Sequence, residues 1–321
     1  MQNSDKKNPF SAVTFHEVDA EYAGQRLDNF LIRLLKGVPK SRIYRLLRKG
    51  VVRVNKGRVK ADTRLATGDV IRVAPIRVSD NSSQGMPGRQ MRVRLNESII
   101  FEDDGLIVID KPSGMAVHGG SGVSFGVIEV LRADRPEAKF LELVHRLDRD
   151  TSGCLMLAKS RAGLVDLQKQ LQQNHIKKSY QALVKGKWPK GKSTINAPLK
   201  KNTLASGERM VRVDVEGKAS VTHFSVAKLY KQASLLNIRL ETGRTHQIRV
   251  HCQFSDQAIA GDPKYGDQEF NQLVKGFGLK RLFLHASCLE FKHPISNVRM
   301  KVEAPLPGDL QSILDKLDSL I

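Results

Sequence analysis

The stretch best suited to carry chemistry is residues 145–153, which read His-Arg-Leu-Asp-Arg-Asp-Thr-Ser-Gly. It places one carboxylate, Asp148, between Arg146 and Arg149, and both flanking segments are mostly apolar. Nearby cations and hydrogen-bond donors keep a carboxylate ionised, which suits it to act as a nucleophile or a base. A lone Asp most often caps a turn, but a charged loop between two apolar strands is a common place for functional residues. We therefore predict that Asp148 is the central reactive group.

A second segment with chemical potential is Thr242–His251, where a glycine-containing turn leads into a predicted helix. Helix N-termini favour anions, and the helix presents His246 near its start and Arg249 one turn further along. His246 and His251 are five residues apart, so they do not form a His-x-x-x-His zinc pair, and no carboxylate ligand lies near them in sequence. The sequence therefore predicts no metal site.

The third candidate is the glycine-rich segment Lys111–Gly120. It lacks the Gly-Lys-Ser/Thr ending of a phosphate-binding loop, and no Gly-x-Gly-x-x-Gly motif opens a helix after a strand. We therefore expect a closely packed loop beside a site, and no cofactor. Tyr180, in Lys178–Leu183, is compatible with plain strand packing or with a role in the site, and the residues alone leave both open.

The charge of the chain restricts the partners that it can bind. Its 53 Lys and Arg outnumber 33 Asp and Glu, which gives a net charge of +20. Such an excess favours polyanions, and nucleic acid is the expected partner. An acidic membrane surface fits less well, because no basic amphipathic helix, lipidation signal or apolar run of ~20 residues is present. The polar N-terminus and three cysteines without a Cys-x-x-Cys pair predict a cytoplasmic chain with buried thiols.

Much of the positive charge is concentrated in residues 24–60, which contain twelve Lys and Arg but a single acid, Asp28. A helix is predicted over residues 27–35 and ends before Gly37 and Pro39, and a second helix is predicted with Ser41 as its N-cap. A basic hairpin follows. We expect this block to contact an RNA or DNA backbone through one helix face and the hairpin, using Arg42, Arg45, Lys49, Lys56 and Arg58.

The sequence predicts three parts. Residues 20–76 form a small basic α/β domain, residues 77–94 have the Gly, Pro and Ser content of a flexible linker, and residues 95–321 form an α+β domain. Strands without regular helical alternation indicate a mixed, mainly antiparallel central sheet in the large domain. Its predicted strands are Ile99–Phe101, Leu106–Ile109, Tyr180–Val184, Ser220–Val226, Ser234–Leu240, Leu282–Phe291 and Met300–Glu303, and its predicted helices are Val123–Arg132, Arg161–Gln173, His246–Phe254 and Asp309–Leu320.

These motifs, in this order, resemble those of the RluA-type pseudouridine synthase family. The resemblance is carried by Lys111–Gly114 with Val117-His118, by His145–Asp148 with Thr151–Gly153, by Tyr180 with Ala182–Val184, and by Thr242–His251. Residues 25–73 are similar to the small RNA-binding module typified by ribosomal protein S-four. Residues 37–41, 118–126 and 142–153 resemble one branch of the family, whose members act on large-subunit (23S) ribosomal RNA.

The resemblance implies a function and a set of site residues. The chain would isomerise uridines of ribosomal RNA to pseudouridine, without a metal or cofactor, and have the pseudouridine synthase fold. Asp148 would be catalytic, Arg249 would pair with it, and Tyr180 would pack against a flipped-out uracil. Arg146 would enter the RNA stack that the uridine has left. We assign further RNA contacts to His145, Arg149, Lys111, Arg244 and His246.

Several alternatives remain open from the sequence. A non-catalytic RNA-binding factor for ribosome assembly would explain the charge and the small domain, but not the loop around Asp148. A DNA-binding regulator and a hydrolase that releases uracil are weaker possibilities. The sequence does not choose between a covalent ester-like route and a glycal route for isomerisation. We expect the chain to be a monomer whose partner is ribosomal RNA, free or in assembling particles, and not a membrane.

Overall fold

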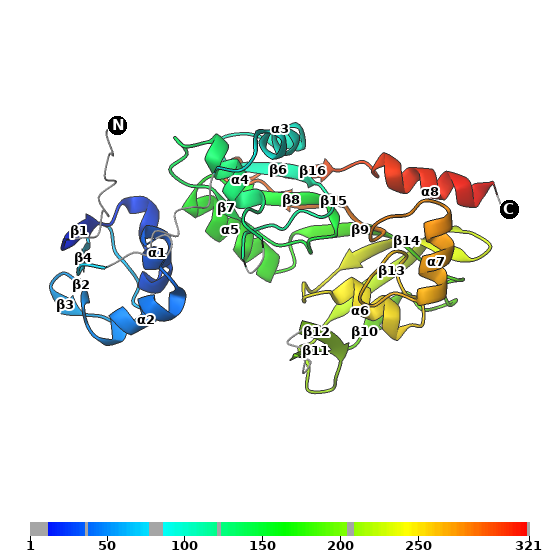
Figure 1. Cartoon of the computed structure of the whole chain (residues 1–321), viewed down its shortest axis with the longest axis horizontal. Helices are drawn as coiled ribbons and strands as arrows, with labels where there is room; N and C mark the ends of the chain where they lie inside the picture. The colour runs from blue at the N-terminus through cyan, green and yellow to red at the C-terminus, as the bar shows by residue number, and fades with distance from the viewer. Residues whose placement is uncertain (1–11, 36–37, 77–85, 121–122, 204–208, 320–321) are drawn as a thin grey trace, which may run out of the picture. The chain divides into compact units, whose positions relative to one another are not determined.

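The computed structural model describes residues 12–35, 38–76, 86–120, 123–203 and 209–319, and the chain divides into two units (Figure 1). The first unit is Met1–Met86 and the second is Pro87–Ile321. Their boundary falls inside the segment predicted as a linker. Residues 77–85 of that segment lie outside the described residues, as does Gly37, the predicted helix end.

The first unit packs two helices against a four-stranded antiparallel sheet. The apolar residues Leu27 and Leu31 of the first helix and Ile43 of the second are fully buried in its core. The two residues of the hairpin turn, Asn55 and Lys56, both have positive φ, as a tight two-residue hairpin requires. The elements are β1 (Thr14–Glu17), the 3-10 turn η1 (Ala20–Tyr22), α1 (Leu27–Leu34), α2 (Lys40–Arg48), β2 (Val52–Val54), β3 (Gly57–Arg58) and β4 (Val70–Val73).

Two details of this unit differ from the sequence prediction. The unit begins before residue 20, because β1 pairs with β4 and closes the sheet on one side. The N-cap of α2 is Pro39 and not Ser41, so the helix begins two residues earlier, at Lys40. A proline has a fixed φ suited to a helix start, and here it replaces the hydroxyl cap that the sequence predicted.

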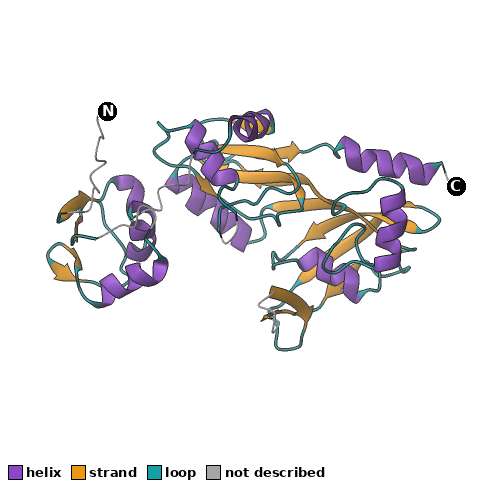
Figure 2. Cartoon of the chain, viewed as in Figure 1, coloured by secondary structure: helices purple, strands orange, loops and turns teal. Residues whose placement is uncertain are grey.

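The strands of the second unit, drawn in orange in Figure 2, form its central sheet. The sheet has ten strands in the order β10-β13-β14-β9-β15-β8-β6-β5, with β16 beside β15 and β7 beside β8. Its described ladders are antiparallel except that between β15 and β8, so the predicted mixed, mainly antiparallel sheet is confirmed. The strands are β5 (Ile99–Glu102), β6 (Leu106–Lys111), β7 (Glu142–Leu143), β8 (Ser152–Ala158), β9 (Lys177–Lys185), β10 (Thr194–Asn196), β13 (Val221–Leu229), β14 (Ala233–Leu240), β15 (Leu284–Lys292) and β16 (Arg299–Glu303). A separate hairpin consists of β11 (Leu199–Thr203) and β12 (Arg209–Val213).

Helices cover both faces of this sheet, so its central strands are buried on both sides. Along β8, Leu155 and Leu157 join one core cluster while Cys154 and Met156 join another, as the period of two in a strand requires. The three cysteines are free and buried. The helices are α3 (Arg89–Glu97), α4 (Val127–Asp134), α5 (Arg161–Gln172), α6 (Gln247–Phe254), α7 (Gln268–Gly276) and α8 (Gly308–Asp318).

Three parts of the second unit depart from the sequence prediction. The last part of the predicted linker is helical: α3 begins at Arg89 and continues past the predicted linker. The helix buries Leu95 in the core of the second unit. The helix predicted from Val123 begins only at Val127, where the carboxylate of Glu129 accepts hydrogen bonds from the backbone N–H groups of Gly126 and Gly119. The sequence also gave no sign of α7 or of the β11–β12 hairpin, whose patterns are short or polar.

Candidate active site

Asp148 lies in the loop that joins β7 to β8, two neighbouring antiparallel strands. The backbone N–H of Thr151 donates to the carbonyl oxygen of Asp148 at 3.2 Å and closes the turn. Gly153 follows with φ of 106°, and a Cβ there would lie 2.2 Å from the carbonyl oxygen of Ala286 on β15. Only glycine permits this backbone and this close approach, so the loop leaves β8 in one defined direction.

Lys111 supports this loop from inside the protein. Its side chain is fully buried, and its ammonium donates to the carbonyl oxygens of Pro112, Met115 and Arg149 at 2.9 Å each. Burial lowers the pKa of Lys111 to about 7, against the opposing attraction of Asp150 and Asp148. The prediction that Lys111 contacts RNA is therefore wrong, because a side chain with no exposed surface and three internal acceptors cannot reach a phosphate. It ties two loops of the site together.

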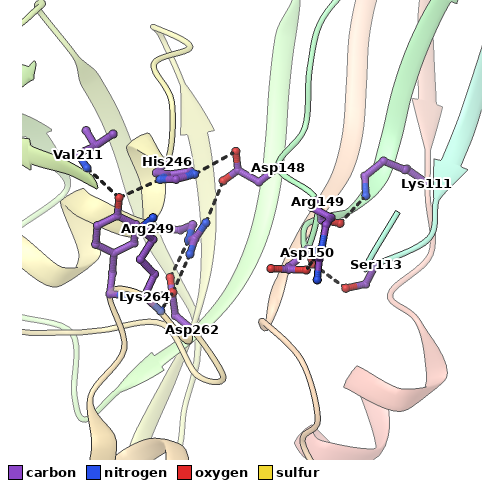
Figure 3. A network of polar contacts seen from close by, with 11 residues as sticks. Lys111, Ser113, Asp148, Arg149, Asp150, Val211, His246, Arg249, Asp262 and Lys264 are labelled. Carbon is purple, nitrogen blue, oxygen red and sulfur yellow. Dashed lines mark hydrogen bonds and ion pairs between the residues drawn. The ribbon is translucent and has the colours of Figure 1, made fainter. Parts of the chain in front are cut away.

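Arg249 on α6 reaches Asp148 from the opposite side (Figure 3). Its Nε and Nη2 donate to the two carboxylate oxygens of Asp262 at 2.7 and 2.8 Å, and its Nη1 donates to Oδ2 of Asp148 at 3.3 Å. Both Arg249 and Asp262 are buried, with 5% and 1% of their surfaces exposed. The two-bond fork to Asp262 fixes the plane of the guanidinium, so that its remaining nitrogen is directed at Asp148.

A second chain of contacts reaches the other oxygen of Asp148. His246 lies just before α6 with a left-handed backbone, φ 54°. Its Nε2 lies 3.9 Å from Oδ1 of Asp148, and its Nδ1 lies 2.8 Å from the hydroxyl of Tyr265. That hydroxyl also accepts a hydrogen bond from the backbone N–H of Val211 in β12, at 3.0 Å. Asp148 is therefore connected to the β11–β12 hairpin through two side chains (Figure 3).

The carboxylate of Asp148 opens into a cavity of about 440 Å³. Of the described residues that line this cavity, Asp148 is the only carboxylate, and it is accompanied by the cations Arg146, Lys178, Arg244 and Arg249. Tyr180, Leu240 and Ile248 form part of an apolar wall. The volume and this mixture of apolar wall and convergent polar groups are typical of a small-molecule site.

Burial changes the ionisation of several groups around the cavity. Burial raises the pKa of Tyr180, so its phenol is protonated at neutral pH. Burial lowers the pKa of His145 to about 4, and its Nε2 accepts a hydrogen bond from the backbone N–H of Met156. His145 is therefore neutral at pH 7 and holds the loop against β8. It cannot supply positive charge to a phosphate.

The Arg249–Asp262 pair stays ionised in spite of its burial. Burial by itself would raise the pKa of Asp262, but the hydrogen bonds and charge of Arg249, with the backbone N–H groups of Tyr265 and Lys264, lower it overall. Burial likewise opposes the charge of Arg249, but Asp262 and Asp148 raise its pKa. The cation beside Asp148 is thus permanent.

The structure brings together most of the residues predicted in the second unit. Asp148, Tyr180, Arg249, Arg146, His145, Arg244 and His246 all line the one cavity. Arg146 and Arg244 are exposed, which suits a contact with a large ligand. Lys111 and Arg149 are the exceptions, because both line a different cavity of about 710 Å³. Arg149 extends away from Arg249 and His246 (Figure 3) and contacts Asp150 at 3.4 Å.

The five basic residues predicted in the first unit all keep their side chains at its surface. Arg45 and Lys49 are exposed and Arg42 is partly exposed, while the hairpin residues Lys56 and Arg58 are exposed. The side chain of Arg58 folds over Gly50 at the end of α2, where a Cβ would lie 2.8 Å from its Nε. This contact places the guanidinium of the hairpin residue Arg58 beside the C-terminal end of α2. Their contact with RNA stays a prediction.

Sequence reasoning missed Asp262, Tyr265 and Lys178. The first two belong to the segment Gly261-Asp262-Pro263-Lys264-Tyr265-Gly266, a loop without a regular pattern. Gly261 and Gly266 flank Asp262 in this loop, and an acid in a glycine-flanked loop was the only sign in the sequence that Asp262 has a specific partner. Lys178 lies two residues before Tyr180 on β9, hence on the same side of the strand.

Within the described ranges, no group of three or more His, Cys, Asp or Glu side chains is placed to hold a metal ion. No helix in the described part of the chain is long and apolar enough to cross a membrane.

Comparison with known proteins identifies the class. A model of the RNA pseudouridylate synthase family matches residues 105–254, and a model of the S4 domain matches residues 25–71. Among solved structures, that of human RNA pseudouridylate synthase domain containing 4 has a TM-score of 0.59 and 26% identity, and the match covers 71% of this chain and 96% of that one. The second unit therefore has the pseudouridine synthase fold.

Full-length relatives narrow the assignment. The ribosomal large subunit pseudouridine synthase C of Yersinia pestis is 54% identical over 298 residues, which are 92% of this chain and 93% of that protein. The protein of the same name from Pasteurella multocida (strain Pm70) is 50% identical over 317 residues, 98% of this chain and 97% of that protein. The chain thus belongs to the RNA pseudouridylate synthase family and carries an S4 domain, and the resemblance predicted from its motifs is confirmed.

Proposed function

We propose that this chain isomerises specific uridines of 23S ribosomal RNA to pseudouridine, with Asp148 acting on the ribose of a uridine that has left its stack. The observation that carries the proposal is the cavity in which Asp148 is the only carboxylate among the described lining residues. The names of the full-length relatives support large-subunit ribosomal RNA as the substrate. The S4 domain supports RNA as the ligand class.

The chemistry of the isomerisation matches a site with a single carboxylate. The bond between N1 of uracil and C1′ of ribose breaks, a bond between C5 and C1′ forms, and a proton leaves C5 while one joins N1. Ordinary glycoside hydrolysis needs two carboxylates, one of them a general acid. Here an oxygen of Asp148 can attack C1′ as uracil leaves with the bonding electron pair, or it can remove a ribose proton to give a glycal. Both routes require that Asp148 be ionised.

Arg249 and Tyr180 have distinct parts in this proposal. Arg249 holds Oδ2 of Asp148 at 3.3 Å with a guanidinium already oriented by Asp262, so the carboxylate is aimed before RNA binds. Tyr180 packs against the detached uracil and, with Leu240 and Ile248, keeps water out of the cavity. Because burial raises the pKa of Tyr180, its phenol is protonated at neutral pH and does not act there as a free base.

Binding of the RNA requires groups at the rim and in the first unit. Moving a base out of its stack costs a few kcal/mol, and the exposed Arg146 offsets part of this cost by filling the gap. Arg244, His246 and Arg149 contact the RNA near the loop. Arg42, Arg45, Lys49, Lys56 and Arg58 add phosphate contacts that do not depend on sequence. The chain acts as a monomer in the cytoplasm, where ribosomal RNA is made.

The decisive test is Asp148→Asn, with turnover followed by tritium release from C5-labelled uridine in 23S ribosomal RNA. We expect turnover to be abolished while RNA affinity stays within a few-fold. Asp150→Asn is the matched control, because Asp150 lies two residues away but lines the other cavity with Arg149. Retained turnover in Asp148→Asn removes Asp148 from its role. A wild-type chain that binds RNA without releasing tritium would favour the non-catalytic assembly factor.

A further inference from the structure

A second groove lies next to the cavity of Asp148, across the turn that joins α5 to β9. Leu171 and Gln172 line the cavity, whereas the next residues, Gln173 and Asn174, line the groove. In the same way Lys178 lines the cavity and Lys177 lines the groove. Successive side chains of a strand point to opposite sides, so the start of β9 directs one lysine to each. We call this depression, of about 590 Å³, the α5–β9 groove.

The α5–β9 groove carries an excess of positive charge. Of its acids, Glu290 is paired with Lys177 at 3.2 Å, and Asp166 accepts a hydrogen bond from Gln170 at 2.6 Å. Among the described residues, the exposed side chains of Lys169, Lys292 and Arg299 form no hydrogen bond or ion pair. These three cations come from α5, β15 and β16, so they converge from separate elements. The groove is also lined by His175 and Lys301.

One cross-strand pair in the groove is electrostatically unfavourable. In the β15–β16 ladder, Lys292 lies directly opposite Arg299, while two positions along Glu290 lies opposite Lys301. Opposite charges facing each other across a ladder stabilise it, and like charges destabilise it. The ladder therefore contains one complementary pair and one repulsive pair, and the repulsive pair faces the groove. An anion bound between Lys292 and Arg299 would relieve the repulsion.

Two elements that line the groove are joined directly by hydrogen bonds. The side chain of Gln170, which is buried, donates to the carbonyl oxygen of Lys292 at 2.8 Å and accepts from its backbone N–H at 3.0 Å. This two-bond contact joins α5 to the end of β15. It holds the backbone of Lys292 against α5, so the points from which the side chains of Lys169 and Lys292 extend are set before a polyanion binds.

We propose that the α5–β9 groove binds the phosphodiester backbone of the substrate RNA beside the target uridine. The inference rests on the proposed function, because an RNA strand that delivers a uridine to Asp148 must continue past the rim of the cavity. The α5–β9 turn is part of that rim, and beyond it lie the three unpaired cations of the groove. Lys178, half-buried in the cavity, stands at the junction of the two depressions.

The test uses the full chain with Lys169→Gln, Lys292→Gln and Arg299→Gln combined. The matched control combines Lys187→Gln, Lys190→Gln and Lys231→Gln, which remove the same charge from exposed positions near the opposite end of β9. The probe is a synthetic hairpin of 23S ribosomal RNA that the wild-type chain modifies. Its dissociation constant is measured over a range of salt concentrations, together with kcat at saturating RNA.

The expected result follows from counterion release. Each phosphate contact contributes about 0.7 to the slope of log affinity against log salt for a single strand, so three lost contacts flatten the slope by about 2.1. When salt rises from about 50 to about 200 mM, the wild-type chain then loses about 18-fold more affinity than the variant if all three residues contact phosphate. The difference is about 7-fold if only two of them do. We expect kcat at saturation to stay unchanged and KM to rise.

The outcomes separate this inference from the proposed function. A salt slope equal to that of the control triple variant overturns the groove, even where the wild-type chain is fully active. Loss of kcat at saturating RNA, with affinity unchanged, also overturns it, because the residues would then act on the reaction. Failure of the wild-type chain to form pseudouridine in any ribosomal RNA refutes the proposed function. In that case, the salt slopes of the groove variant and the control variant on protein-free 23S ribosomal RNA still decide whether the groove binds RNA.

Discussion

The contact between Arg249 and Asp262 gives a sharp prediction, because it is buried and Asp262 lies outside the motifs of the sequence. The substitution Asp262→Asn keeps the volume of the side chain but removes its charge. One amide oxygen can still accept from Arg249, whereas the amide NH₂ group faces a guanidinium N–H and cannot pair with it. Arg249 would be left with the more distant Asp148 as its only carboxylate partner at the site.

The size of the effect follows from burial. Removing one partner of a buried ion pair costs about 3–5 kcal/mol, and Asn retains part of the hydrogen bonding, so we expect a loss of about 3 kcal/mol in the free energy of unfolding. Turnover should fall on the order of 10²-fold, because a small misplacement of a positioning group has effects of that size. RNA affinity should change little, since neither residue is exposed.

Asp309→Asn is the matched control for Asp262→Asn. Asp309 makes the same two-bond contact with Arg281, at 2.7 and 3.1 Å, but its side chain is 59% exposed. Exposed pairs contribute only about 0–1 kcal/mol. Urea unfolding is followed by the fluorescence of Trp188, the single tryptophan, which is buried in the second unit. Equal losses of stability in the two variants would refute the reasoning.

The same variant has a signature in its pH dependence. The pKa of Asp262 in the folded chain lies below the ordinary value of 3.8, because Arg249 outweighs the effect of burial. Its contribution to stability is therefore complete above that ordinary value and is lost as the pH falls through the lower folded value. The difference in unfolding free energy between wild type and Asp262→Asn should accordingly shrink in acid.

Three further predictions concern the rest of the chain. Burial lowers the pKa of Lys111 from 10.5 to about 7, so the unfolded chain holds a proton that the folded chain has lost between these two values. The wild-type free energy of unfolding should therefore rise with pH across that interval, by up to about 1.4 kcal/mol per pH unit. Lys111→Met should remove this rise, as measured by urea unfolding followed through Trp188 fluorescence. Gly153→Ala places a Cβ 2.2 Å from a carbonyl oxygen and should cost about 3 kcal/mol or more, whereas Gly191→Ala, also at positive φ but with open space, should cost about 1 kcal/mol in thermal unfolding. Removing residues 1–86 should weaken RNA binding and flatten its salt dependence while leaving a folded second unit, and an unchanged salt slope would contradict the phosphate contacts assigned to the first unit.

Local patterns in the sequence were sufficient for several features. The hairpin of β5 and β6 follows from an Asp-Gly turn between apolar runs, and α5 was predicted as a helix over Arg161–Gln173. The loop around Asp148 could be singled out because its charges interrupt two apolar strands. The start of α6 near His246 was predicted to within one residue. Such features depend on residues close together in the chain, where turn chemistry and side-chain period act directly.

The sequence by itself determined that a carboxylate set among arginines and a basic RNA-binding module lie in one chain, because residue type and short spacing suffice for both. The tertiary structure decided that Asp262 orients Arg249 and that Lys111 is an internal support and not an RNA contact. Whether a charged side chain faces solvent or a set of carbonyl groups depends on strands and loops far apart in sequence. Charged residues are rarely buried without partners, and those partners are brought together only by the folded sheet.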